Sequence, residues 1–98
     1  MADWTDDPVV RDFRAQISDA DAAILEAVNK RLELVGRLRE YKESQGYPFV
    51  DRKREAALLE ELARANPGPL SPDGLRQLYA CLLGLTKREV SGRTAQTL

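Results

Sequence analysis

The feature that most constrains the fold is the stretch from Asp7 to about Ser44, which carries apolar residues at steps of three and four. This spacing predicts one long amphipathic α-helix, which starts with Asp7 as its N-cap and Pro8 in its first turn. Its apolar stripe consists of Val10, Phe13, Ile17, Ala20, Ile24, Val28, Val35 and Leu38. A helix of roughly 36 residues is about 54 Å long, whereas a compact domain of this size has a radius of gyration of about 13 Å. Because the remaining chain is too short to cover the stripe, we expect a helical homodimer with the long helices packed antiparallel.

Two cations, Arg31 and Lys42, occupy positions of this stripe where an apolar residue is expected. By helix geometry they are about 20° apart in azimuth and about 16 Å apart along the axis. A buried charge without a partner is costly, so each cation needs an anion from the protein or from a ligand. The alternative is that both side chains extend out of the stripe and cover its edge.

A third basic residue, Arg14, lies on the same predicted helix. Its azimuth differs from that of Arg31 by about 100°, and the two are about 25 Å apart along the axis. Arg14 therefore cannot serve the same pocket from the same helix. If it takes part in the site, it must come from a second copy of the chain.

The length, charge and residue composition of the chain argue against several classes of function. The 98 residues are enough for one small domain over 1–98, and the net charge of -1 argues against nucleic acid as a partner. No signal-like or membrane-length apolar run is present, so we expect a cytoplasmic protein with no membrane partner. The absence of histidine removes Ser-His and Cys-His catalysis and argues against zinc or iron, so we expect neither metal nor cofactor. Cys81, the one cysteine, fits a reducing compartment and is interpreted as a small buried residue.

The rest of the sequence predicts two further helices. Gly46 and Pro48 end the long helix, and Asp51 is a candidate N-cap for a second helix over about 52–65. Ser71, Pro72 and Asp73 are the start signal of a third helix. Its apolar stripe consists of Leu75, Leu78 or Tyr79, Leu82, Thr86 and Val90. Residues 1–6 and 91–98 are expected to fray, with folding of Trp4 back onto the dimer as the alternative for that residue. With no strand pattern, the sequence predicts an all-α fold with three helices per chain.

A set of residues along these helices resembles the all-helical (AroQ-type) chorismate mutases. The set comprises Phe13-Arg14-Ala15-Gln16-Ile17, Asp21, Arg31, Lys42 and Asp51-Arg52-Lys53-Arg54-Glu55. The likeness covers about Val10 to Val90, including the turn before the third helix. It implies an isomerase that converts chorismate to prephenate, a step towards phenylalanine and tyrosine. It also implies an intertwined homodimer with two sites, each receiving one residue from the neighbouring long helix.

The resemblance assigns roles to individual residues. Arg31 and Arg14 of the second subunit would hold the two carboxylates of the substrate, and Lys42 would face its ether oxygen. Glu55 and the backbone near Asp51 would receive the ring hydroxyl, while Arg54 would steady that region. From the sequence pattern without the resemblance, Asp51 is a helix cap and Glu55 a surface acid beside Arg52.

The third helix departs from the family pattern, which places a small polar residue one turn before a Gln or Glu that donates to the ether oxygen. Thr86 fits the first place, but the residue four further on is Val90, and Glu89 is about 100° off that face. Either the last turn shifts so that a protonated Glu89 reaches the site, which predicts higher activity at acid pH, or the site lacks this donor. The second option predicts a slow enzyme, tuned by a partner such as the first enzyme of the shikimate pathway.

Three rival functions remain open. Within the same fold, the protein could be a mutase of 4-amino-4-deoxychorismate or an isochorismate-pyruvate lyase. Asp51 and Glu55 favour a hydroxyl or amino substituent on the ring and weaken the lyase hypothesis. A rival of another class is a non-catalytic helical dimer with a regulatory or scaffolding role, in which Arg31 and Lys42 would be edge charges.

Overall fold

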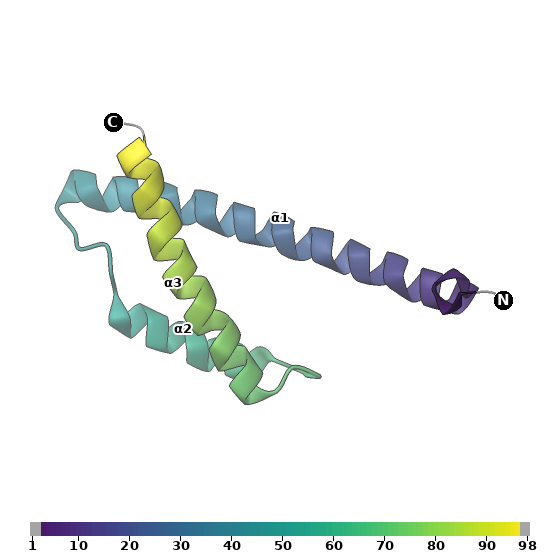
Figure 1. Ribbon diagram of the computed structural model, residues 1–98. Helices are drawn as coiled ribbons and strands as arrows, with labels where there is room; N and C mark the ends of the chain where they lie inside the picture. The colour runs from purple at the N-terminus through teal and green to yellow at the C-terminus, as the bar shows by residue number, and fades with distance from the viewer. Residues whose placement is uncertain (1–2, 97–98) are drawn as a thin grey trace. The chain divides into compact units, whose positions relative to one another are not determined.

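The computed structural model describes residues 3–96, with side chains described as far as Ser91. All regular structure in this range is helical (Figure 1): a short 3-10 helix η1 (Trp4–Asp6) precedes α1 (Pro8–Gln45), α2 (Arg52–Ala65) and α3 (Pro72–Gln96). The prediction of an all-α fold with three helices is confirmed. The 38 residues of α1 give a helix about 57 Å long.

Polar side chains at the predicted start positions cap all three helices. The carboxylate of Asp7 accepts a hydrogen bond from the Val9 amide at 2.8 Å, and that of Asp51 accepts one from the Arg54 amide at 3.0 Å. The hydroxyl oxygen of Ser71 accepts one from the Gly74 amide at 3.0 Å. Each bond satisfies an N–H that has no partner within its own helix. The three start signals are therefore confirmed.

The end of α1 has the hydrogen bonds of a Schellman motif. The Tyr47 amide donates to the Lys42 carbonyl at 2.8 Å, and the Gly46 amide donates to the Glu43 carbonyl at 3.2 Å. Gly46 adopts a φ of 73°, a left-handed conformation in which a side chain would be strained. This turn directs the chain into the loop that leads to α2.

Both expected frayed ends contain regular structure where they are described. At the N-terminus, Asp3 caps η1 by accepting a hydrogen bond from the Thr5 amide at 3.2 Å, and hydrogen bonding from Thr5 lowers the pKa of this carboxyl. At the other end, α3 continues past Val90 to Gln96. The outermost expected tail residues, 1–2 and 97–98, lie outside the described part of the chain.

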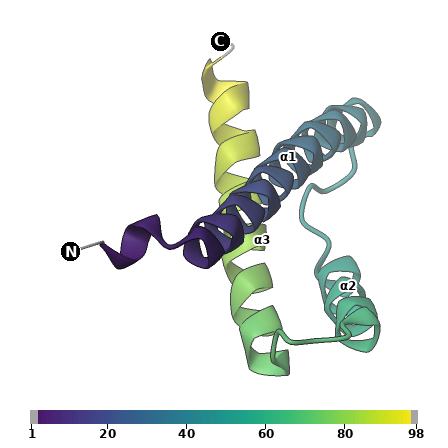
Figure 2. The same ribbon diagram turned by 90° about the vertical axis from the view of Figure 1, so that its right-hand side faces the viewer.

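The chain divides into two compact units, Met1–Glu33 and Leu34–Leu98. In the second unit, α2 and α3 lie side by side and contact each other (Figure 2). Its buried apolar residues are Leu75 and Val90, which are 6% and 3% exposed. Cys81 is exposed, so its interpretation as a buried residue is wrong. The physical reason is that Cys81 precedes Val90 by about two and a half turns and so lies on the opposite face of α3.

Most residues of the apolar stripe of α1 are exposed. None of the residues of α1, all of which the structure describes, is buried. In the first unit, Phe13, Ile17 and Ile24 are 60%, 59% and 61% exposed. The expectation from the sequence, that a second copy of the chain covers this stripe, stays a prediction.

Candidate functional site

The candidate residues fall in both units. Arg14 and Arg31 lie in the unit Met1–Glu33, and both are carried by α1. The remaining candidates lie in the unit Leu34–Leu98 and come from the end of α1, the start of α2 and the C-terminal half of α3: Lys42, Asp51, Arg54, Glu55, Thr86, Glu89 and Val90.

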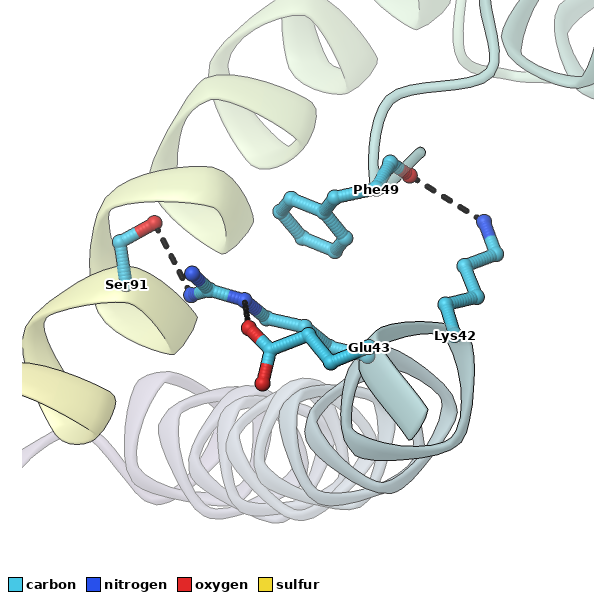
Figure 3. A network of polar contacts seen from close by, with 5 residues as sticks. Lys42, Glu43, Phe49 and Ser91 are labelled. Carbon is cyan, nitrogen blue, oxygen red and sulfur yellow. Dashed lines mark hydrogen bonds and ion pairs between the residues drawn. The ribbon is translucent and has the colours of Figure 1, made fainter. Parts of the chain in front are cut away.

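Lys42 connects the end of α1 to the loop that follows it. Its ammonium donates a hydrogen bond to the carbonyl oxygen of Phe49 at 3.1 Å (Figure 3). An ammonium has three N–H donors, so this bond does not exhaust its capacity to bind an anion. Lys42 is partly buried, which strengthens its electrostatic interactions relative to those of a fully solvated lysine.

Arg39 joins α1 to the loop and to α3. Its guanidinium carbon lies 5.1 Å from the centre of the Phe49 ring, its Nε donates to Glu43 at 3.1 Å, and its Nη1 donates to the Ser91 hydroxyl at 3.2 Å (Figure 3). The Arg39 side chain is only 20% exposed. Since Phe49 also accepts the bond from Lys42, Arg39 helps to fix the loop against which the Lys42 ammonium rests.

The sequence did not point to Arg39 or Phe49 as parts of the site. The four-residue spacing of Arg39 and Glu43 is a signal for an ion pair on a helix and could have been used. The contacts with Phe49 and Ser91 join residues far apart in the chain, and no local spacing indicates them.

The start of α2 presents two acids with different roles, Asp51 at the N-cap and Glu55 in the first turn. Asp51 is the N-cap described above, whereas Glu55 forms an ion pair with Lys87 of α3, with Nζ and Oε1 2.8 Å apart. The Glu55 side chain is 27% exposed. Glu55 is therefore a partly buried acid paired across two helices, which differs from the surface acid beside Arg52 that the sequence pattern suggested. Arg54 is 61% exposed and lies 3.6 Å from Glu61, within its own helix.

The C-terminal half of α3 buries two of the three candidates on that helix. Thr86 and Val90 are 4% and 3% exposed, and the Thr86 hydroxyl donates to the Leu82 carbonyl at 2.7 Å. Glu89 is exposed. The option in which Glu89 reaches inward therefore requires this turn of α3 to rotate by about 100°.

In the first unit, the guanidinium of Arg14 lies over the ring of Trp4, with its central carbon 5.0 Å from the ring centre. Such a cation–π contact restricts where the charged group can go. Arg14 is exposed, and Arg31 is partly buried. The sequence left Trp4 in the segment 1–6 as either frayed or folded back onto the dimer, and it did not indicate Arg14 as its partner.

Each unit carries cationic side chains with hydrogen-bond donors of the kind that bind small anions. Arginine forks bind carboxylates with paired hydrogen bonds, Lys42 adds a compact positive charge, and Glu55 can accept a hydrogen bond. Within residues 3–96, no three or more Cys, Asp or Glu side chains gather in a way that could hold a metal ion. None of the described helices has the length and apolar character to cross a membrane.

Comparison with known proteins identifies relatives. A family model described as chorismate mutase type II matches residues 13–90. A protein from Streptomyces pristinaespiralis named 4-amino-4-deoxychorismate mutase is 37% identical over 77 residues, which cover 78% of this chain and 60% of that protein. This chain thus spans less than two thirds of the length of that curated relative. No solved structure matches significantly.

Proposed function

Because this chain belongs to the chorismate mutase type II family, we propose that it catalyses the rearrangement of chorismate to prephenate. The observation that carries this proposal is the extent of the family match, residues 13–90, which includes every candidate residue from Arg14 to Val90. Family membership supports a mutase-type isomerase activity, and both this activity and the identity of the substrate are part of the proposal.

The reaction is an intramolecular [3,3] rearrangement, so it needs no nucleophile, redox group or proton shuttle. The protein contributes by holding a flexible dianion in a compact, chair-like pose and by placing charge where the ether bond breaks. A histidine-free chain suits this chemistry. The two substrate carboxylates require two guanidinium groups, and we assign these to Arg31 and to Arg14 of a second subunit.

Lys42 is the group that we assign to the ether oxygen, which gains negative charge as the C–O bond breaks. A preorganised donor of this kind is worth about 3–4 kcal/mol, or two to three orders of magnitude in rate. The hydrogen bond to Phe49 supports this role because it holds the ammonium in one place before the substrate arrives.

Glu55 is the group that we assign to the ring substituent, with the backbone beside Asp51. The ion pair with Lys87 occupies Oε1 of Glu55, and the second carboxylate oxygen can accept a hydrogen bond from a ring hydroxyl. Glu55 lies in the first turn of α2, where the cap formed by Asp51 fixes the local backbone.

We also propose that the active form is a homodimer. The exposure of Phe13, Ile17 and Ile24 supports this, since an uncovered apolar stripe of such length favours burial against a second copy. The proposal also supplies Arg14, because a residue so distant from Arg31 along α1 can reach a shared site only from another subunit.

The test is direct. Purified protein is mixed with chorismate, and the loss of chorismate absorbance and the formation of prephenate are followed against the uncatalysed background. We expect turnover that saturates with chorismate. If folded protein gives no turnover above background, the proposal fails and a non-catalytic helical dimer is favoured. Turnover of isochorismate with pyruvate release, but not of chorismate, would instead identify a lyase.

A second candidate substrate is 4-amino-4-deoxychorismate, favoured by the name of the Streptomyces pristinaespiralis relative. This compound carries an amino group in place of the ring hydroxyl, so the two candidates differ at the position that we assign to Glu55. Parallel measurement of kcat/KM for both compounds decides between them. We expect the larger value for chorismate.

A further inference from the structure

We propose that Lys87 is a specificity-determining residue that makes the site favour a neutral hydroxyl over a positively charged amino group on the substrate ring. This inference rests on the proposed function, because it requires Glu55 to face the ring substituent. Lys87 acts through Glu55 and does not need to contact the substrate itself.

The geometry that carries the proposal is the ion pair between α2 and α3. The ammonium of Lys87 lies 2.8 Å from Oε1 of Glu55, and the two side chains are 41% and 27% exposed. Lys87 directly follows the buried Thr86 and lies less than one turn before the buried Val90. The pair therefore sits beside the packed contact between the two helices, where a charge–charge interaction is screened less than on an open surface.

Other charges near the start of α2 do not take over this role. Arg54, the residue before Glu55, lies 3.6 Å from Glu61 and is 61% exposed. Asp51 uses its carboxylate to cap the helix. Lys87 is thus the cation whose described contact offsets the charge of the Glu55 carboxylate.

The consequence differs for the two ring substituents. A hydroxyl group donates a hydrogen bond to one carboxylate oxygen and brings no charge, so it can share Glu55 with Lys87. An amino group on a ring carbon is positively charged near neutral pH, as alkyl amines are. It would meet a carboxylate that is already paired and would be repelled by the neighbouring ammonium of Lys87.

The test compares the specificity ratio, kcat/KM for 4-amino-4-deoxychorismate divided by kcat/KM for chorismate, in the wild-type protein and in Lys87→Gln. Glutamine keeps much of the side-chain length but removes the charge. We expect the ratio to rise about tenfold, which corresponds to about 1.4 kcal/mol. Lys87→Arg keeps the charge and should leave the ratio within about twofold of wild type. Arg88→Gln removes the same charge from the next, exposed position of α3 and should also leave the ratio unchanged.

Three results would overturn the inference. The first is an unchanged ratio in Lys87→Gln with wild-type turnover of chorismate, and the second is an equal rise in Arg88→Gln, which would indicate a general charge effect. The third is a rise of the same size when Lys87→Gln is made in a Glu55→Gln background, since Lys87 would then act without Glu55. A wild-type protein that turns over neither compound would refute the proposed function itself, so the two failures are distinguishable.

Discussion

Lys42 is the single side chain on which the proposed chemistry depends most. It is partly buried and held by the Phe49 carbonyl at 3.1 Å, so its position is set before any ligand binds. We expect Lys42→Ala to lower kcat/KM for chorismate by about two to three orders of magnitude, because one preorganised donor to the developing negative charge is lost. Steady-state kinetics together with circular dichroism measures this.

The matched control for Lys42→Ala is Lys30→Ala, which removes the same charge from an exposed position of α1 and should change kcat/KM less than twofold. Arg31→Ala is expected to lose activity to a similar extent as Lys42→Ala, mainly through weaker carboxylate binding. If Lys42→Ala or Arg31→Ala unfolds while the residual folded protein retains its specific activity, that cation has a structural role and its assignment is wrong.

Val90 gives the second prediction for a single residue. It is 3% exposed and can donate no hydrogen bond, at the position where the family pattern places a donor to the ether oxygen. We expect Val90→Gln to raise kcat by about tenfold or more if the side chain reaches that oxygen, because it adds a donor in a buried place. Glu89→Gln, at an exposed position, should leave both kcat and its pH dependence unchanged. Loss of activity at high pH in the wild type that disappears in Glu89→Gln would instead show that a protonated Glu89 reaches the site.

Single residues also show where sequence reasoning stops. Asp7, Asp51 and Ser71 were recognised as caps because a cap is a local feature, defined by the residue and the helix that follows it. The pairing of Glu55 with Lys87 and the stacking of Arg39 on Phe49 were not predicted, because each depends on how separate segments pack. Without the tertiary packing, the sequence does not indicate which residues of α2 lie opposite which residues of α3.

At the level of the helices, the end of α1 is the element on which the position of Lys42 depends. The carbonyl of Lys42 accepts the Tyr47 amide in the terminal turn, and Gly46 supplies the left-handed conformation that this turn needs. We expect Gly46→Ala to lower the free energy of unfolding by about 1 kcal/mol, because alanine is strained at positive φ. Chemical denaturation followed by circular dichroism measures the change.

A glycine inside the same helix provides the comparison. Gly36 has helical geometry, and a Cβ added there meets nothing within 4 Å in the chain. Gly36→Ala should therefore be neutral or raise the free energy of unfolding by up to about 1 kcal/mol, through helix propensity. Equal effects of the two substitutions would contradict the role of the Gly46 turn.

The bounds of the helices were predicted well from the sequence, whereas the buried residues on each helix were predicted less well. α1 and α2 begin and end within about two residues of the expected positions. In α3, the sequence left Leu78 and Tyr79 as alternatives for the apolar stripe, and the structure partly buries Tyr79 and leaves Leu78 53% exposed. Neighbouring positions of a helix differ by about 100°, so only the packing partner decides between them.

For the whole molecule, the uncovered stripe of α1 and the position of Arg14 support one arrangement, in which two chains complete each other's sites. We expect Arg14→Ala and Arg31→Ala each to be nearly inactive as homodimers. When the two are mixed and allowed to exchange subunits, each heterodimer has one site with both arginines intact. Activity should return to about a quarter of that of wild type, since half of the dimers are heterodimers with one working site of two. Kinetics before and after mixing measures this.

The outcome that contradicts the shared site is the absence of recovered activity although subunit exchange is demonstrated, for example by mass spectrometry of labelled chains.

Trp4→Ala provides a further test, because it keeps both arginines and changes only the N-terminal turn. Trp4 lies under the Arg14 guanidinium at 5.0 Å, so its loss should raise KM severalfold and leave kcat nearly unchanged. A fall in kcat without a change in KM would show that Trp4 does not act through Arg14.

The exposed apolar stripe of α1 affects how the amount of active enzyme in a cell depends on the expression level. If the site exists only in the assembled pair, then well below the dissociation constant its amount grows with the square of the chain concentration, so doubling the expression level would yield about four times as many working sites. The rate of product formation would then rise more steeply with gene dosage than it does for a monomeric enzyme. Initial rates measured at successive dilutions would fall by more than the dilution factor.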